Sequence, residues 1–180
     1  MLEEERKLIK KATVGESEAF GLLYDYYLPK IYRFILIKVS HREEAEDLSH
    51  QVFLRAWQNI REYDDRGYPF SSWLYRIARN AVIDYYRQNK QLIGLSEARC
   101  QLAEETEAGD KTAVLIEFER ALAALKQLNP IDQEVIVLRF IEEFSIAETA
   151  ASVNKTEGAV KLIQHRALKR LKKILEKPEK

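Results

Sequence analysis

Hydrophobic positions along this chain recur with the period of an α-helix, and no stretch alternates with the period of two that a half-buried strand shows. The pattern therefore predicts an all-α fold. Helices are expected over residues 2–13, 16–28, 29–39, 40 to about 59–61, 71–87, 110–128, 130–140, 145–153 and 157–175. Pro29 is expected to break or kink the chain between the second and third of these helices.

Polar residues suited to helix ends support these boundaries. The expected caps, in chain order, are Ser40 with Glu43, Ser71 or Ser72, Asn129 followed by Pro130, Ser145 with Glu148, and Thr156, with Asn154 in a left-handed turn. A capped short helix, a tight turn and a long basic helix over residues 145–175 have the spacing of a helix-turn-helix.

Charge divides the chain although its formal net charge is zero. Residues 96–119 are mostly acidic, whereas the tail after residue 154 is rich in Lys and Arg. We predict two small helical domains, an N-terminal helical bundle over 1–92 and a C-terminal helix-turn-helix over 112–180, joined by an acidic linker over 93–111. Such a distribution is consistent with nucleic-acid binding that is partly screened by the chain's own acidic segment.

Several function classes find no support in the sequence. Cys100 is the only cysteine, and His41, His50 and His165 lack metal-ligand spacing, so neither a disulfide nor a metal or other cofactor is expected. No apolar segment has the length of a signal peptide core or a membrane span, which predicts a cytoplasmic protein without membrane insertion. No nucleophile–base set or glycine-rich phosphate loop indicates an enzyme.

The segment SSWLYRIARNAVIDYYR, residues 71–87, combines an apolar face with a face of arginines, aromatic rings and an amide. That face holds Trp73, Arg76, Asn80, Ile83 and Arg87, with Tyr75, Arg79 and Tyr86 beside it. Arginines bind phosphates, rings stack on bases, and an amide reads a base edge. The preceding loop, residues 62–70, could trap an unpaired base. The alternatives are an ordinary amphipathic helix with solvated arginines, and a Phe70 ring buried in the core.

Two further surfaces are candidates. On the helix over 40–61, Leu54 lies on the polar face with Asp47, His50 and Gln51, as either an unremarkable exposed leucine or an interface anchor. On the last helix, Glu157, Lys161, Leu162, His165 and Arg166 would face base edges in a major groove, and Lys169, Lys172 and Lys173 would lie nearer phosphates. The alternative for the last helix is a solvated basic helix in a bundle.

These pieces, in this order, resemble the extracytoplasmic-function group of the bacterial sigma-70 family, the specificity subunits of RNA polymerase. The resemblance rests on EEAEDLSHQVFLRAW, on WLYRIARN, and on LNPIDQEVIVLRFIEEFSIAETAASVNKTEGAVKLIQHRALKRL. It implies a transcription initiation factor that performs no catalysis. Its implied partners are the clamp coiled coil of the largest polymerase subunit, the flap of the second-largest subunit, promoter DNA and an anti-sigma factor.

The resemblance also assigns residues to three roles. Polymerase docking falls to Asp47, His50, Gln51 and Leu54. Capture of the melted −10 element falls to Asp64, Arg66, Phe70, Trp73, Arg76, Arg79, Asn80 and Arg87. Contacts to the −35 duplex fall to Thr156, Glu157, Lys161, Leu162, His165, Arg166 and Lys169.

The sequence departs from the family pattern in two places, one in the expected docking helix and one in the last helix. His50-Gln51 stands where members often carry Gln-Glu, and Leu162-Ile163 stands where Ser-Arg is usual. Gln164 falls inside the apolar arc of the last helix without an evident reason. A polymerase-independent helix-turn-helix regulator remains the alternative function, and it would leave the Leu54 and Trp73 faces unexplained.

Overall fold

The computed structural model describes residues 4–64, 68–93 and 113–176. Within these ranges the regular structure is helical, which confirms the predicted all-α class. The chain forms two compact units, residues 1–100 and 101–180, and each is described by itself. Each of the described helices is too short or too polar to span a lipid bilayer.

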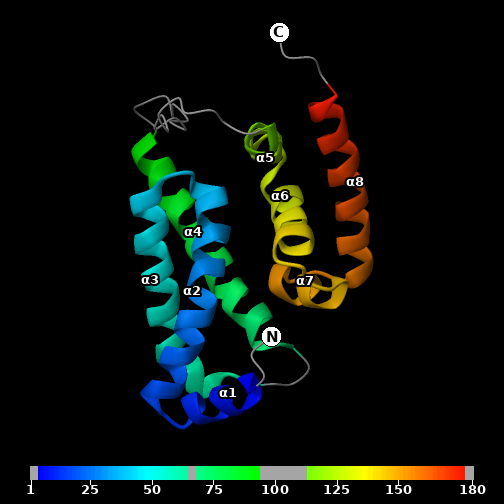
Figure 1. The fold of residues 1–180 in the computed structure, drawn as a ribbon. Helices are drawn as coiled ribbons and strands as arrows, with labels where there is room; N and C mark the ends of the chain where they lie inside the picture. The colour runs from blue at the N-terminus through cyan, green and yellow to red at the C-terminus, as the bar shows by residue number, and fades with distance from the viewer. Residues whose placement is uncertain (1–3, 65–67, 94–112, 177–180) are drawn as a thin grey trace. The chain divides into compact units, whose positions relative to one another are not determined.

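The first unit is a bundle of four α-helices (Figure 1). It contains α1 (Glu5–Thr13), α2 (Ser17–Val39), α3 (Arg42–Asn59), the short 3₁₀ turn η1 (Ile60–Glu62) and α4 (Phe70–Ile93). Helices α2, α3 and α4 pack on one another, and α1 packs on α2. The helical period brings apolar residues of all three long helices into one core, among them Ile31, Phe34, Val52 and Leu74.

The second unit places a long helix against three shorter ones. It contains α5 (Ala113–Lys126), α6 (Pro130–Ile136), the π-helical turn η2 (Val137–Ile141), α7 (Ile146–Val153) and α8 (Glu157–Leu175). Helix α8 packs on α5, α6 and α7, and its buried face includes Val160, Ile163 and Ala167. The burial of Ile163 explains structurally why an apolar residue occupies this position.

Four of the expected helix boundaries in the second unit are confirmed at atomic detail. Asn129 caps α6 by accepting a hydrogen bond from the backbone N–H of Asp132, with Pro130 at the first helical position. Ser145 and Glu148 form both hydrogen bonds of the capping box at α7. Asn154 takes the left-handed conformation at φ 54°. The side chain of Thr156 then caps α8.

Several predicted boundaries in the first unit are wrong, and α4 also continues to Ile93 instead of ending at Arg87. A single helix, α2, continues through Pro29, because burial of its apolar face outweighs the local cost of proline. Ser40 does not open α3; it ends α2 in a left-handed conformation, and extended His41 precedes α3 without a side-chain cap. Helix α4 begins at Phe70, directly after Pro69, rather than at a serine cap.

Candidate protein and nucleic-acid interfaces

Helix α3 presents a polar stripe that contains one exposed leucine. Asp47, His50, Gln51 and Leu54 are spaced i, i+3, i+4 and i+7, so they share one face of the helix, and all four are exposed. We call these four residues the docking stripe. The opposite face of α3 is buried against the core, which fixes the orientation of the stripe.

Leu54 is 57% exposed, although Val52, Phe53 and Ala56 are buried. Its neighbours Phe53 and Ala56 point into the core, and Arg55 lies within 3.7 Å of Asp84 on α4. His50 also contributes to an open groove of about 280 Å³, whose other lining residues are Leu28, Pro29, Tyr32, Glu46 and Ser49. The stripe is therefore an apolar anchor with polar groups around it, beside a shallow groove.

The start of α4 is held by a cluster of aromatic rings. Phe70 is 2% exposed, and its ring centroid lies 5.6 Å from Tyr27, 5.5 Å from Tyr63 and 5.4 Å from Trp73. The expectation that Phe70 contacts DNA is therefore corrected: its ring is enclosed by other rings and supports the surface instead. Tyr75, expected beside the polar face, is likewise buried, where it packs edge-on against Phe34.

Burial also reaches the hydroxyl group of Tyr27, which donates a 2.8 Å hydrogen bond to Glu5 on α1. Removal from water raises the pKa of Tyr27 well above its ordinary value, and the Glu5 charge adds to the shift. This contact ties α1 to the aromatic cluster. Sequence reasoning missed it because the two residues lie on different helices.

The other face of α4 matches the prediction. Arg76, Asn80, Ile83 and Arg87 are exposed along one side, and Trp73 is half-buried at the start of the helix. Arg79 is also half-buried, so only part of its side chain is accessible. Asp64 is exposed before the loop, and Arg66 lies outside the described residues.

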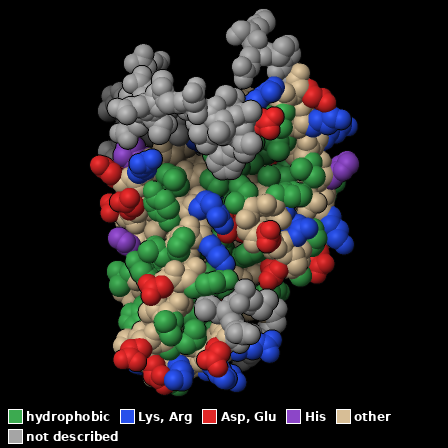
Figure 2. All heavy atoms as spheres, in the orientation of Figure 1, with side chains coloured by type: hydrophobic (Ala, Val, Ile, Leu, Met, Phe, Trp, Pro, Cys, Tyr) green, Lys and Arg blue, Asp and Glu red, His purple; other side chains and the backbone are tan. Residues whose placement is uncertain are grey.

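Helices α7 and α8 form the predicted helix-turn-helix. Lys161, Leu162, His165, Arg166 and Lys169 are exposed on one face of α8, and Thr156 and Glu157 are exposed at its start. Leu162 is 68% exposed. In the view of Figure 2, Lys and Arg side chains together with a histidine lie along the edge that α8 forms.

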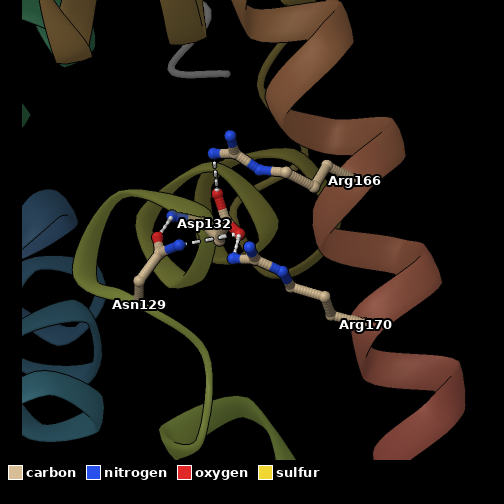
Figure 3. A network of polar contacts seen from close by, with 4 residues as sticks. All are labelled: Asn129, Asp132, Arg166 and Arg170. Atoms are coloured by element: carbon tan, nitrogen blue, oxygen red, sulfur yellow. Dashed lines mark hydrogen bonds and ion pairs between the residues drawn. The ribbon is translucent and has the colours of Figure 1, made fainter.

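A buried carboxylate connects α6 to two arginines of α8 (Figure 3). Sequence reasoning does not single out this residue. Asp132 is fully buried, and its Oδ1 and Oδ2 atoms accept hydrogen bonds from Arg166 at 2.6 Å and Arg170 at 2.7 Å. Asn129 donates a further bond to Oδ2 at 3.0 Å. The hydrogen bond to Asp132 raises the pKa of Arg166. An acidic residue three positions after the Asn129 cap is a feature of the sequence that could have drawn attention to Asp132. Its arginine partners, however, lie 34 and 38 residues away.

A second polar contact explains Gln164. Its Oε1 accepts a 3.0 Å hydrogen bond from Nε of Arg139, and another nitrogen of Arg139 donates to the backbone carbonyl of Phe144. Arg139, which lies in η2, thus contacts both Phe144, the residue before the α7 cap, and Gln164 on α8. Gln164, the polar residue in the apolar arc of α8, therefore has a hydrogen-bond partner.

Both halves of this arrangement match known protein families. The Sigma-70 region 2 family matches residues 23–91, which contain the docking stripe and most of α4. The Sigma-70, region 4 family matches residues 124–173, which contain the helix-turn-helix. A helical bundle of this family, followed along the chain by a helix-turn-helix, is the organisation of a sigma factor.

Two similar proteins identify the group within this family. It is 38% identical to the ECF RNA polymerase sigma factor BldN of Streptomyces coelicolor over 94% of this chain, and it spans 65% of the length of that protein. It is 34% identical to the ECF RNA polymerase sigma factor SigX of Bacillus subtilis, over 89% of this chain and 85% of SigX. The chain therefore belongs to the sigma-70 family, in its extracytoplasmic-function (ECF) group.

A solved structure is also similar. CnrH, in complex with the cytosolic domain of CnrY, is 26% identical, with a TM-score of 0.74 over 97% of this chain and 98% of CnrH. The sigma factor RpoE of Bartonella quintana, in complex with the anti-sigma factor NepR, shares the fold at 23% identity and a TM-score of 0.72, over 89% of this chain and 98% of RpoE.

Proposed function

We propose that this protein is a transcription initiation factor that binds core RNA polymerase and directs it to specific promoters. Family membership carries the proposal, and the three outward surfaces on α3, α4 and α8 support it. The chain itself performs no catalysis, because the polymerase forms the RNA bonds. It acts in the cytoplasm, together with polymerase, promoter DNA and an anti-sigma factor.

The docking stripe is the surface we assign to the clamp coiled coil of the largest polymerase subunit. An exposed leucine surrounded by polar groups is the arrangement of an interface anchor, in which the apolar side chain is desolvated and the polar rim pairs around it. The neutral Gln51 makes this rim less acidic than the family pattern. The helix-turn-helix unit is assigned to the flap of the second-largest subunit.

Helix α4 is assigned to capture of the melted −10 strand. Unstacking a base costs a few kcal/mol, and stacking on an aromatic ring returns about 1–3 kcal/mol per base. A few captured bases therefore suffice to shift a nearly balanced duplex toward the open form. The residues that we assign to this surface are Trp73, Arg76, Arg79, Asn80 and Arg87, with Asp64 shortly before α4. Arg66, which the resemblance adds, lies outside the described residues.

Helix α8 is assigned to the −35 duplex. Lys161, Leu162, His165 and Arg166 face the base edges, and Thr156, Glu157 and Lys169 lie at the margins of the same surface. Leu162 replaces a polar residue common in the family, and its apolar side chain suits a thymine methyl group. The promoter preference of this protein is therefore expected to differ from that of members with serine there.

Run-off transcription tests the function directly. Purified core polymerase with the full-length chain should initiate RNA synthesis from a subset of a promoter library, and core polymerase alone should not. Absence of initiation from every template would contradict the proposal. Tight binding to duplex operators without polymerase would instead favour the polymerase-independent regulator.

A substitution in the docking stripe separates docking from folding. Leu54→Asp is expected to abolish binding to core polymerase, because a charge would be buried at the centre of the interface. Leu22→Asp is the matched control, since Leu22 is 55% exposed on α2 and lies outside the stripe. Affinity for core polymerase is measured by fluorescence anisotropy, with circular dichroism to verify folding. If folded Leu54→Asp binds core polymerase normally, Leu54 is an ordinary exposed leucine and not an interface anchor.

A substitution on α4 separates opening from initial binding. Asn80→Ala is expected to reduce promoter opening about 10-fold while closed-complex affinity changes less than about 2-fold, because a base contact worth about 1–3 kcal/mol exists only after strand separation. Permanganate footprinting measures opening, and duplex binding by holoenzyme measures the closed complex. Equal losses in the two assays would argue against this role.

A further inference from the structure

Asp132 lies one layer behind the surface that we assign to the −35 element. Its carboxylate is fully buried between α6 and α8, and each oxygen contacts a different arginine of α8. A buried carboxylate loses its hydration and must be paired. Here the pairing partners are side chains that also reach the protein surface, since the Arg166 and Arg170 side chains remain 46% and 49% exposed.

The contact to Arg166 leaves most of its guanidinium available. The bond from Nη2 to Oδ1 is a single contact of 2.6 Å, and a guanidinium has five N–H donors. The Asp132 carboxylate is itself held by the amide of Asn129, the residue that caps α6. A rigid element therefore fixes one edge of the Arg166 guanidinium and leaves the remaining donors for another acceptor.

This arrangement distinguishes Arg166 from the lysines on the same face. Lys161 and Lys169 are exposed and carry flexible ammonium groups, which act as point charges and have no planar fork to match two acceptors. Arg166 presents a planar fork whose orientation is set before DNA arrives, so less side-chain freedom is lost on binding. An arginine fork of fixed orientation is the group that reads the two acceptors of guanine in a major groove.

We propose that Asp132 is a positioning residue for −35 recognition, and that it acts by holding the Arg166 guanidinium toward a base edge. Arg170, one helical turn further along α8, occupies the second oxygen and keeps the carboxylate paired. The proposal rests on the proposed function of α8. It adds a buried residue of α6, outside the helix-turn-helix itself, to the determinants of promoter choice.

The test uses holoenzyme reconstituted from core polymerase and the full-length chain. A promoter that the wild type transcribes is compared with the same fragment carrying a scrambled −35 element, and the ratio of the two closed-complex dissociation constants is the −35 preference. Asp132→Asn is expected to lower this preference about 5-fold or more, the effect of losing one good base contact. A ratio is needed because removing a negative charge strengthens binding to any DNA.

A double-mutant cycle distinguishes positioning from simple destabilisation. If Asp132 acts through Arg166, Arg166→Gln alone and the Asp132→Asn/Arg166→Gln pair should show the same preference within about 2-fold. Additive losses would overturn the proposal, and so would an unchanged preference in folded Asp132→Asn. Arg170→Gln is the matched control, because it removes a half-exposed cation beside the same carboxylate and leaves in place both the Asn129 amide that orients Oδ2 and the contact to Arg166. It should keep the preference within about 2-fold.

A milder variant serves if Asp132→Asn does not fold. Asn129→Ser keeps a good helix cap but removes the amide that holds Oδ2 of Asp132. A loss of preference that disappears in the Arg166→Gln background supports the proposal, and an unchanged preference overturns it. A wild-type holoenzyme with no −35 preference would instead contradict the role assigned to α8, whatever the behaviour of Asp132.

Discussion

The two units of this protein support their outward surfaces by different means. In the first unit, the exposed face of α4 rests on aromatic packing, with Phe70 enclosed by Tyr27, Tyr63 and Trp73. In the second unit, the exposed face of α8 rests on polar contacts from Asp132 and Arg139. One surface is supported by apolar volume and the other by paired charges and amides.

This difference has physical consequences. Apolar contacts are not directional, so a core of rings tolerates small shifts while it keeps its stability. Buried polar contacts require particular partners, and removing one partner leaves the other desolvated. The first unit should therefore respond mainly to changes of side-chain volume, and the second to changes of hydrogen-bonding groups.

The largest effect is expected from the aromatic cluster. Phe70→Ala should destabilise the first unit by about 3–5 kcal/mol, because a fully buried ring is replaced by a cavity. Trp57 and Trp73 are the two tryptophans of the chain and both lie in the first unit, so tryptophan fluorescence during urea unfolding follows this unit. Phe70→Leu, which keeps most of the volume, is the control and should cost much less. A loss below about 1 kcal/mol in Phe70→Ala would contradict enclosure of the ring.

A smaller effect is expected from the polar contacts of the second unit. Arg139→Ala should cost about 1–3 kcal/mol, since it leaves the acceptors of Gln164 and Phe144 without their donor. Far-UV circular dichroism should show the loss, and tryptophan fluorescence should not. Lys172→Ala is the control in the same unit, because its exposed pair with Glu176 at 3.6 Å contributes about 0.5 kcal/mol or less. Equal effects of the two substitutions would contradict a supporting role for the polar contacts of Arg139.

The same contrast explains how far the sequence predicts the structure. Helical periodicity correctly predicts most of the buried and exposed positions of α3 and α8, including exposed Leu54 and buried Ile163, although Leu168 on the apolar arc of α8 is 39% exposed. Local cap chemistry correctly predicts the starts of α6, α7 and α8, because each cap bonds within a few residues. These features are encoded by neighbours in the chain.

What the sequence does not predict depends on distant partners. Continuation of α2 through Pro29 and the use of Ser40 to end that helix follow from tertiary packing that local propensity does not contain. Burial of Phe70 is only an alternative at the sequence level, because its partner Tyr27 lies 43 positions earlier. The pairing of Asp132 with Arg166 needs a fold before the two residues meet. Among the candidate sites, the exposed stripes were therefore predictable and their supports were not.

The smallest effect is expected from placing glycine at a left-handed backbone position in each unit. Glu143 has a positive φ of 57° and Ser40 one of 61°, a region in which side chains other than glycine are strained by about 1 kcal/mol or slightly more. Glu143→Gly should therefore stabilise the second unit by about 1 kcal/mol, seen by circular dichroism, and Ser40→Gly the first unit by a similar amount, seen by fluorescence. Asn154→Gly is the control, because asparagine already tolerates its φ of 54°, and it should change stability by only a few tenths of a kcal/mol. For a unit of this size, about 1 kcal/mol corresponds to a rise in Tm of about 4–8 °C, which thermal unfolding resolves. An equal gain in all three variants, or none in Glu143→Gly, would show that these left-handed positions are not strained as their residue types indicate.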